Sequence, residues 1–195
     1  MRIIGGTARG RRLAVPDGPT VRPTADRVRE AVFSSLHAHV PAARVLDLFA
    51  GSGALGLEAI SRGAAHVTFV ERDRRAVAAI RANIDALDVA RNATVVVADV
   101  LRAVTDGQLD GGPFDLVFAD PPYAVDAGTV DALLAGLPPH LADGAQIVLE
   151  RATAAPGPTW PARMTGVRAR RYGATTIHRA YYGAADRGTR REESR

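Results

Sequence analysis

A stretch near the middle of the chain, FDLVFADPPY at residues 114–123, contains residue types that could hold an exocyclic amine. Its apolar run ends at Asp120, and two prolines and Tyr123 follow at once. The Asp120 carboxylate and the Pro121 carbonyl, fixed by the stiff Pro121–Pro122 backbone, could each accept one N–H of the amine. The Tyr123 ring could stack on the base that carries the amine, which contributes about 1–3 kcal/mol per base. The stretch therefore predicts a clamp for the amino group of a nucleobase, with a simple strand-ending turn as the alternative.

A second motif, DLFAGSGALG, has the spacing Gly51-x-Gly53-x-x-Gly56 between an apolar run and a helical pattern. Because glycine has no Cβ, the backbone at such a motif can turn tightly and lie against a ligand. Glu71 ends the next apolar run, where an acid can accept hydrogen bonds from both hydroxyls of a ribose. The motif predicts a nucleotide-like ligand, but alone it does not separate a dinucleotide from other ligands of this kind.

Acids stand at or near the ends of four successive apolar runs: Asp47, Glu71, Asp99 and Asp120. Each acid alone could cap the following helix, but together they would gather at one edge of a parallel sheet, where ligands bind. A pyrophosphate is unfavourable among carboxylates, whereas S-adenosylmethionine has no phosphate and carries a sulfonium and an ammonium group. The acids therefore favour S-adenosylmethionine as the cofactor, with Asp47 near its amino-acid end and Asp99 near its adenine amino group.

The elements that must position these motifs follow from the apolar periodicity. We expect strands at residues 44–50, 66–70, 94–98, 114–119 and 146–150. We expect helices at residues 25–39, with Thr24 as the N-cap, and at 54–61, 74–87 and 129–137. Continuous apolar strands that alternate with helices predict an α/β fold with a parallel sheet covered on both faces.

The two ends of the chain differ from this middle part. Residues 1–20 predict a separate small β-hairpin, and residues 21–183 form the main domain. Residues 166–172 and 175–183 predict a closing antiparallel pair of strands. Residues 184–195 are polar, so a disordered tail is expected there.

Composition limits the possible chemistry. The 195 residues include no cysteine, which excludes disulfides, thiolate zinc sites and cysteine nucleophiles. No two of the five histidines have convincing metal-ligand spacing, so no metal is expected. No long apolar run or secretory signal core is present, and nothing signals a dimer. A monomeric cytoplasmic protein without membrane contact is the expectation.

The charges are unevenly distributed, and all 25 basic residues are arginines. Residues 1–30 have a net charge of +4, residues 31–150 of −7 and residues 151–195 of +7. Arginine binds phosphate through two parallel hydrogen bonds and stacks on bases. Basic ends around an acidic middle therefore indicate a catalytic body whose flanks meet a polyanion, with an ordinary solvated surface as the alternative.

These motifs resemble a known family. FDLVFADPPY and VLDLFAGSGALGLEAISRGA look like class I S-adenosylmethionine-dependent methyltransferases that act on base amino groups. MRIIGGTARGRRL and RPTADRVREAVFSSL resemble the opening of the bacterial small-subunit ribosomal RNA guanine-N2 methyltransferases, which modify one guanine in the head of the 30S particle. The resemblance covers residue 1 to about residue 150, and the C-terminal stretch diverges more.

The resemblance implies a Rossmann-like sheet of seven strands, mainly parallel with an antiparallel last strand, and an N-terminal hairpin that contacts RNA. It implies methylation of a guanine N2 amine in 16S ribosomal RNA, with the assembled 30S subunit as partner. The predicted catalytic residues are Asp120, Pro121, Pro122 and Tyr123. The predicted cofactor residues are Asp47, Phe49, Ala50, Gly51, Gly53, Glu71, Arg72, Asp99, Val100 and Asp120. The predicted RNA-binding residues are Arg2, Arg9, Arg11, Arg12, Arg22, Thr24 and Arg27.

Three other functions fit parts of the pattern. An adenine-N6 DNA or RNA methyltransferase would use the same Asp-Pro-Pro-Tyr corner, although the chain has no sizeable insertion for recognising a DNA sequence. A nicotinamide-dependent oxidoreductase would use the glycine motif, but a Tyr-x-x-x-Lys proton donor is impossible in a chain without lysine. An RNA-binding module without catalytic activity would explain the basic ends and leave the acidic residues without a role.

Overall fold

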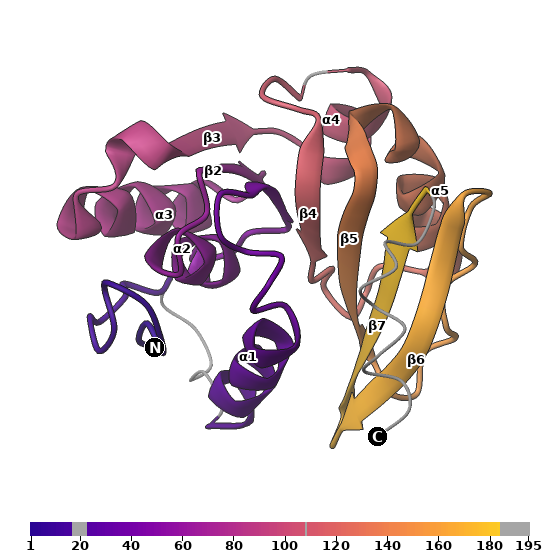
Figure 1. Ribbon diagram of the computed structural model, residues 1–195, viewed down its shortest axis with the longest axis horizontal. Helices are drawn as coiled ribbons and strands as arrows, with labels where there is room; N and C mark the ends of the chain where they lie inside the picture. The colour runs from indigo at the N-terminus through magenta and orange to yellow at the C-terminus, as the bar shows by residue number, and fades with distance from the viewer. Residues whose placement is uncertain (17–22, 108, 184–195) are drawn as a thin grey trace.

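The computed structural model describes residues 1–16, 23–107 and 109–183. Seven strands form one sheet in the order β3-β2-β1-β4-β5-β7-β6 (Figure 1). The strands are β1 (Arg44–Leu48), β2 (His66–Glu71), β3 (Ala93–Val97), β4 (Phe114–Ala119), β5 (Leu141–Ala152), β6 (Met164–Tyr172) and β7 (Thr175–Tyr182). The helices are α1 (Pro23–Ser35), α2 (Ala54–Ser61), α3 (Arg74–Leu87), α4 (Val100–Thr105) and α5 (Ala127–Gly136), with short 3-10 turns at Ala90–Asn92 and Pro138–His140.

The first five strands pair in parallel, and β7 runs antiparallel to both of its neighbours, β5 and β6. This arrangement confirms the predicted fold class, a mainly parallel seven-stranded sheet with an antiparallel last strand. The continuous apolar strands pack on both faces, as predicted. Helices α1, α2 and α3 lie against one face, and α4 and α5 against the other (Figure 1).

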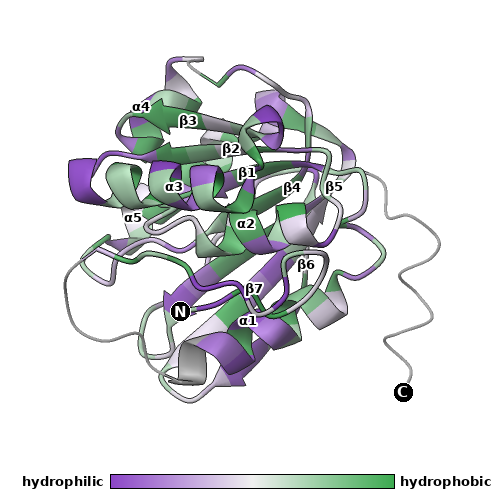
Figure 2. Cartoon of the chain, turned by 90° about the vertical axis from the view of Figure 1, so that its left-hand side faces the viewer, coloured by the Kyte–Doolittle hydropathy of each residue, from purple (hydrophilic) through white to green (hydrophobic). Residues whose placement is uncertain are grey.

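Alternate residues of each strand point into the two hydrophobic cores. In β4, Leu116 and Phe118 belong to the core under α1, α2 and α3, and Val117 and Ala119 belong to the core under α4 and α5. The apolar colour of the central strands in Figure 2 reflects this double burial. Because the side chains alternate, the residue that follows Ala119 faces the α1 and α2 side of the sheet.

Helix α1 begins earlier and ends earlier than the sequence predicts, at Pro23 and Ser35 instead of residues 25 and 39. Thr24 therefore lies in the first turn and is not the N-cap. Proline suits the first helical position, because its missing N–H would have no partner inside the helix. Strand β5 begins earlier and ends later than predicted, and the closing antiparallel pair is present as expected.

The N-terminal segment matches the predicted hairpin in part. Arg2 and Arg12 form an antiparallel bridge, flanked by backbone hydrogen bonds from Ile3 to Arg11 at 3.0 Å and from Leu13 to Met1 at 3.1 Å, but no longer strand forms between residues 1 and 13. The segment is also no separate unit, because Ile3 and Leu13 are buried in the core shared with α1, α2 and α3. Glu58 of α2, which is fully buried, accepts hydrogen bonds from the backbone of the segment.

The predicted tail at residues 184–195 lies outside the described residues. Within the described ranges, no helix is both long enough and apolar enough to cross a membrane.

Candidate functional site

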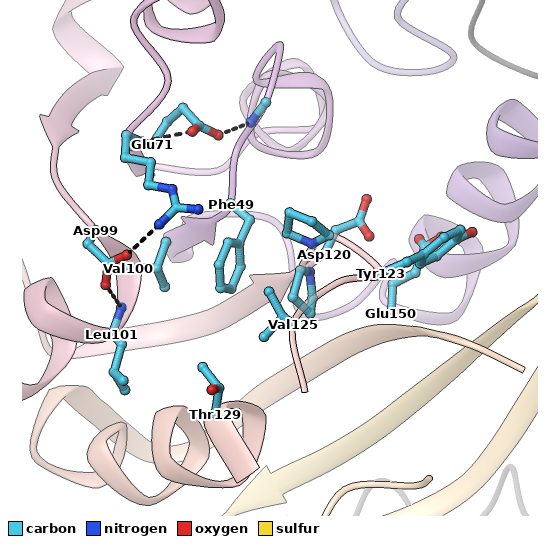
Figure 3. Close-up of a pocket in the computed structure, with 14 residues that line it drawn as sticks. Phe49, Glu71, Asp99, Val100, Leu101, Asp120, Tyr123, Val125, Thr129 and Glu150 are labelled. Atoms are coloured by element: carbon cyan, nitrogen blue, oxygen red, sulfur yellow. Dashed lines mark hydrogen bonds and ion pairs between the residues drawn. The ribbon is translucent and has the colours of Figure 1, made fainter. Parts of the chain in front are cut away.

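A pocket of about 580 Å³ opens at the carboxyl ends of the parallel strands. It is lined by Phe49, Gly51, Glu71, Arg72, Asp99, Val100, Leu101, Asp120, Pro121, Pro122, Tyr123, Val125, Thr129 and Glu150. Figure 3 shows Glu71 and Asp99 at one end of this pocket, and Asp120, Tyr123 and Glu150 at the other. The parallel strands thus bring the predicted cofactor residues and the predicted base clamp to one place, as the sequence indicates.

The glycine motif forms the turn between β1 and α2. Gly51 and Gly53 have φ angles of 57° and 78°, in the left-handed region that favours glycine. Gly56 serves packing, because a Cβ there would lie only 2.3 Å from the ring of Phe69. Asn83 of α3 supports the turn by donating to the carbonyl of Ser52 at 3.0 Å. The motif therefore holds the backbone close to the pocket and close to the neighbouring strand.

Asp47 does not line the pocket. Its side chain is 1% exposed, and its Oδ2 accepts a hydrogen bond from the Gly56 N–H at 2.9 Å. Burial, and then the nearby Asp120 and Glu71 carboxylates, raise the pKa of Asp47 to about 8. Asp47 thus supports the glycine turn from below the pocket, and its predicted role near the amino-acid end of the cofactor stays a prediction.

Glu71 lines the pocket and already binds the backbone around it. Its Oε2 accepts from the Gly51 N–H at 2.9 Å, and its Oε1 accepts from the N–H groups of Arg72 and Asp73, both at 2.8 Å. A carboxylate has about four acceptor positions, so about one remains for a ligand hydroxyl. Glu71 is therefore held in place by the backbone and keeps acceptor capacity for a ligand, and its predicted contact with both ribose hydroxyls stays a prediction.

Asp99 lines the pocket and caps a helix as well. Its Oδ1 accepts from the N–H groups of Leu101 and Arg102 at the start of α4. Its Oδ2 pairs with the guanidinium of Arg72 at 3.0 Å, and both side chains are exposed (Figure 3). An exposed ion pair contributes only about 0–1 kcal/mol, so a ligand can displace Arg72 at little cost.

The Asp120 corner follows directly on β4. The Asp120 N–H donates to the carbonyl of Leu48 at 3.4 Å, and the Val125 N–H donates to the carbonyl of Pro122 at 2.9 Å. Pro121 is buried, whereas the Tyr123 side chain is 68% exposed. The corner therefore has a rigid backbone and offers an aromatic ring to a partner outside the chain.

The acidity of this corner is shifted. Asp120 opens to the cleft, but protein atoms surround much of it, and this desolvation raises its pKa to about 7, with a further contribution from the Glu150 carboxylate. Desolvation also raises the pKa of Glu150, against a lowering hydrogen bond from the Thr175 side chain. Hydrogen-bond donors or cations that enter the pocket would therefore stabilise the ionised form of both carboxylates.

Of the predicted cofactor residues, seven line the pocket: Phe49, Gly51, Glu71, Arg72, Asp99, Val100 and Asp120. Ala50 and Gly53 do not line it and instead close the turn, because the Gly53 N–H donates to the Ala50 carbonyl at 2.7 Å. The sequence analysis missed four lining residues: Leu101, Val125, Thr129 and Glu150. Only Glu150 carried a signal, since it ends the apolar run of a fifth strand just as the other acids end theirs.

Three of the arginines predicted to bind RNA come together. Arg2, Arg9 and Arg27 are exposed and line a groove of about 370 Å³ between the N-terminal segment and α1, where the acids Asp26 and Glu30 also lie. Arg11 points elsewhere, because its guanidinium donates to the Ala86 carbonyl at the end of α3. Arg12 is exposed but does not line this groove. Arg22 and the side chain of Thr24 lie outside the described residues.

The strand order, the antiparallel β7 and the pocket at the carboxyl edge together define the fold of class I, S-adenosylmethionine-dependent methyltransferases. The chain belongs to the family described as conserved hypothetical protein 95, whose model matches residues 1–181. The solved structure of yhhF from Escherichia coli is 39% identical with a TM-score of 0.83, over 94% of this chain and 98% of that chain.

Two curated relatives extend this comparison. Ribosomal RNA small subunit methyltransferase D of Escherichia coli (strain K12) is 48% identical over 123 residues, which are 63% of this chain and 60% of that protein. The tRNA1(Val) (adenine(37)-N6)-methyltransferase of Shewanella sp. (strain MR-7) is 35% identical over 82 residues, which are 42% of this chain and 34% of that protein. The chain thus aligns with less than two thirds of each relative's length.

Proposed function

We propose that this protein transfers a methyl group from S-adenosylmethionine to an exocyclic amine of a base in ribosomal RNA. The observation that carries the proposal is the position of the Asp120 carboxylate, at the end of β4 and inside the pocket that also holds Glu71 and Asp99. The similarity to ribosomal RNA small subunit methyltransferase D supports ribosomal RNA as the substrate class.

The residues of the pocket fit S-adenosylmethionine. Four carboxylates line it, and its single lining cation, Arg72, is paired with Asp99. This charge pattern favours a cationic ligand and disfavours a pyrophosphate. Glu71 retains room for one ribose hydroxyl, and Val100 and Leu101 offer apolar surface to an adenine ring. When bound, S-adenosylmethionine supplies a methyl carbon activated by the adjacent sulfonium.

The residues of the corner orient the amine for in-line attack. Asp120 accepts a hydrogen bond from one amine N–H, and the Pro121 carbonyl accepts one from the other, which turns the nitrogen lone pair towards the methyl donor. Tyr123 stacks on the base and holds its plane. After transfer the nitrogen is cationic, and the proton that it loses passes to Asp120 or to water. Positioning and fixed charges thus accelerate the methyl transfer, and no covalent enzyme intermediate forms.

The proposed substrate is the N2 amine of one guanine in 16S ribosomal RNA, presented by the assembled 30S subunit. The support comes from the relatives and from the arginine groove beside α1, which offers phosphate contacts outside the acidic pocket. Adenine N6 is the second candidate, because the corner itself fits either amine and a curated adenine-N6 methyltransferase is similar over 82 residues.

The test replaces Asp120 with alanine and separates binding from transfer. We expect methyl transfer to 30S particles from a strain lacking this protein to fall by about 10²–10³-fold, the usual loss for one preorganised electrostatic contact. We expect the affinity for S-adenosylmethionine in calorimetry to change by less than about tenfold, because Asp120 lies at the opposite end of the pocket from Glu71 and Asp99 (Figure 3). The matched control is Asp85→Asn, at an exposed acid on α3. Near wild-type transfer by Asp120→Ala would refute the assignment.

A further inference from the structure

Two carboxylates stand side by side at the base-binding end of the pocket. Strands β4 and β5 pair in parallel with Phe118 opposite Val148 and Ala119 opposite Leu149. The next residues along these strands, Asp120 and Glu150, therefore lie in adjacent positions on the same face, and paired strands are about 4.8 Å apart. Figure 3 shows both side chains at the end of the pocket that holds Tyr123.

The same two acids also line a second, smaller cavity of about 130 Å³ on the α1 side of the sheet. Its other walls are mostly apolar, and its single lining cation is Arg29 of α1, which is 5% exposed. Arg29 Nε is buried and has no hydrogen-bond partner in the described part of the chain. The cavity thus has hydrogen-bond acceptors on one side, apolar surface beside them, and a buried arginine whose Nε lies 4.0 Å from Glu58 Oε2.

We propose that Glu150 determines base specificity by accepting a hydrogen bond from N1–H of a guanine whose N2 amine is held by Asp120. This proposal deepens the proposed function and rests on it. Guanine carries N1–H beside its N2 amine, so its edge presents adjacent donors to the two adjacent carboxylates.

Adenine has the opposite arrangement beside its amine. Its N1 is an unprotonated acceptor next to the N6 amine, and a carboxylate placed against it would meet a lone pair and receive no hydrogen bond. A buried polar group that finds no partner costs about 1–3 kcal/mol, and more when it is charged. Glu150 therefore favours guanine over adenine at a corner that, by itself, accepts either amine.

The surroundings of Glu150 fix it for this role. The Thr175 side chain at the start of β7 hydrogen-bonds Glu150, and Glu150 is paired through the backbone ladder with Ile177. Desolvation raises the pKa of both Asp120 and Glu150, and the Glu150 carboxylate raises that of Asp120 further; a donor-rich edge that enters beside them offsets both effects. The two neighbouring carboxylates thus destabilise the empty site, and the N–H donors of a bound guanine stabilise it.

The test uses 30S particles reconstituted with 16S ribosomal RNA in which the target guanine is retained or replaced by 2-aminopurine. This base keeps the N2 amine and has an acceptor at N1. For Glu150→Gln we expect kcat/KM on guanine to fall by about 3–10-fold, because the amide oxygen can still accept from N1–H but the hydrogen bond loses its charge. On 2-aminopurine we expect no fall, because the amide can donate to N1. Asp85→Asn is the control for loss of one negative charge.

A second variant, Thr175→Val, keeps the strand-forming shape and removes the hydroxyl. It should lower kcat/KM on guanine more than on 2-aminopurine. Thermal melting will show whether Glu150→Gln is folded, and the Thr175→Val variant tests the proposal if it is not. Equal falls on both bases would overturn the specificity role and leave the proposed function intact. Transfer to neither base by the wild-type protein would overturn the proposed function and this inference with it.

Discussion

Glu58 of α2 holds the N-terminal segment on the body of the protein. Its carboxylate is fully buried and accepts hydrogen bonds from the backbone N–H groups of Ile4 at 2.7 Å and Gly5 at 2.8 Å. It also pairs with Arg62 at 2.7 Å and lies 4.0 Å from Arg29. We predict that Glu58→Gln detaches this segment and weakens the whole fold.

The magnitude follows from what the amide cannot replace. Glutamine keeps one acceptor oxygen but turns an NH₂ group towards donors that have lost their partner. Arg29 is 5% exposed and would retain only Asp26, at 3.0 Å, as a close carboxylate. Breaking a buried ion pair by changing one partner costs about 3–5 kcal/mol. This is a large part of the roughly 5–15 kcal/mol that stabilises a typical domain.

Urea denaturation would measure the loss, and amide hydrogen exchange at Ile4 and Gly5 would locate it. The control is Asp85→Asn, an exposed acid on α3 where we expect a change within about 0.5 kcal/mol. We expect faster exchange at both amides in Glu58→Gln than in the control. A destabilisation below about 1 kcal/mol with unchanged exchange would show that Glu58 does not hold the segment, and this reasoning would fail.

Two further predictions concern activity. Burial raises the pKa of Asp120 to about 7, so the protonated form, which accepts hydrogen bonds poorly, prevails below that pH. We therefore expect kcat/KM to rise with pH through about 7. The kcat profile should rise at a lower pH, because the bound cationic donor stabilises the Asp120 carboxylate and lowers its pKa. A flat pH profile would contradict this. Replacing Arg2, Arg9 and Arg27 with glutamine should weaken RNA binding and reduce the slope of log K against log salt by about 0.7 for each lost phosphate contact, about 2 in all. The control is a triple change to glutamine at Arg74, Arg75 and Arg81 of α3. The groove makes no phosphate contacts if its variant has the wild-type salt slope, or if the control variant lowers the slope by the same amount.

Much of the fold was accessible from the sequence, because strong apolar periodicity specified each parallel strand and its helix. RVLDL and FDLVFA are buried on both faces, which only a parallel sheet between two helical layers provides. The N-terminal segment was predicted less well. Its short apolar runs form only one antiparallel bridge; Ile3 and Leu13 serve the main core, and two of its backbone N–H groups donate to Glu58, which is distant in sequence. Local patterns do not reveal such long-range contacts.

The candidate site was predictable in composition and less so in detail. The sequence places acids at the sheet edge, but it cannot show which carboxylates the backbone already occupies. Asp47 is satisfied by Gly56 below the pocket, and Glu71 has three backbone donors. Glu150 ends the predicted strand at residues 146–150 and so carried the same signal as the other acids, but it was not counted among them, and the observed strand continues past it to Ala152.

The difference between a capping acid and a free one can nevertheless be read from the residues that follow it. Asp73 and Asp99 both accept from backbone N–H groups two and three positions later and thereby begin α3 and α4. Asp120 is followed by Pro121 and Pro122, and the residue two positions later therefore has no N–H to donate. The two prolines thus do more than stiffen the corner. They remove the backbone donor two positions later that Asp73 and Asp99 use, so that more of the acceptor capacity of Asp120 stays available to an amine that enters from outside the chain.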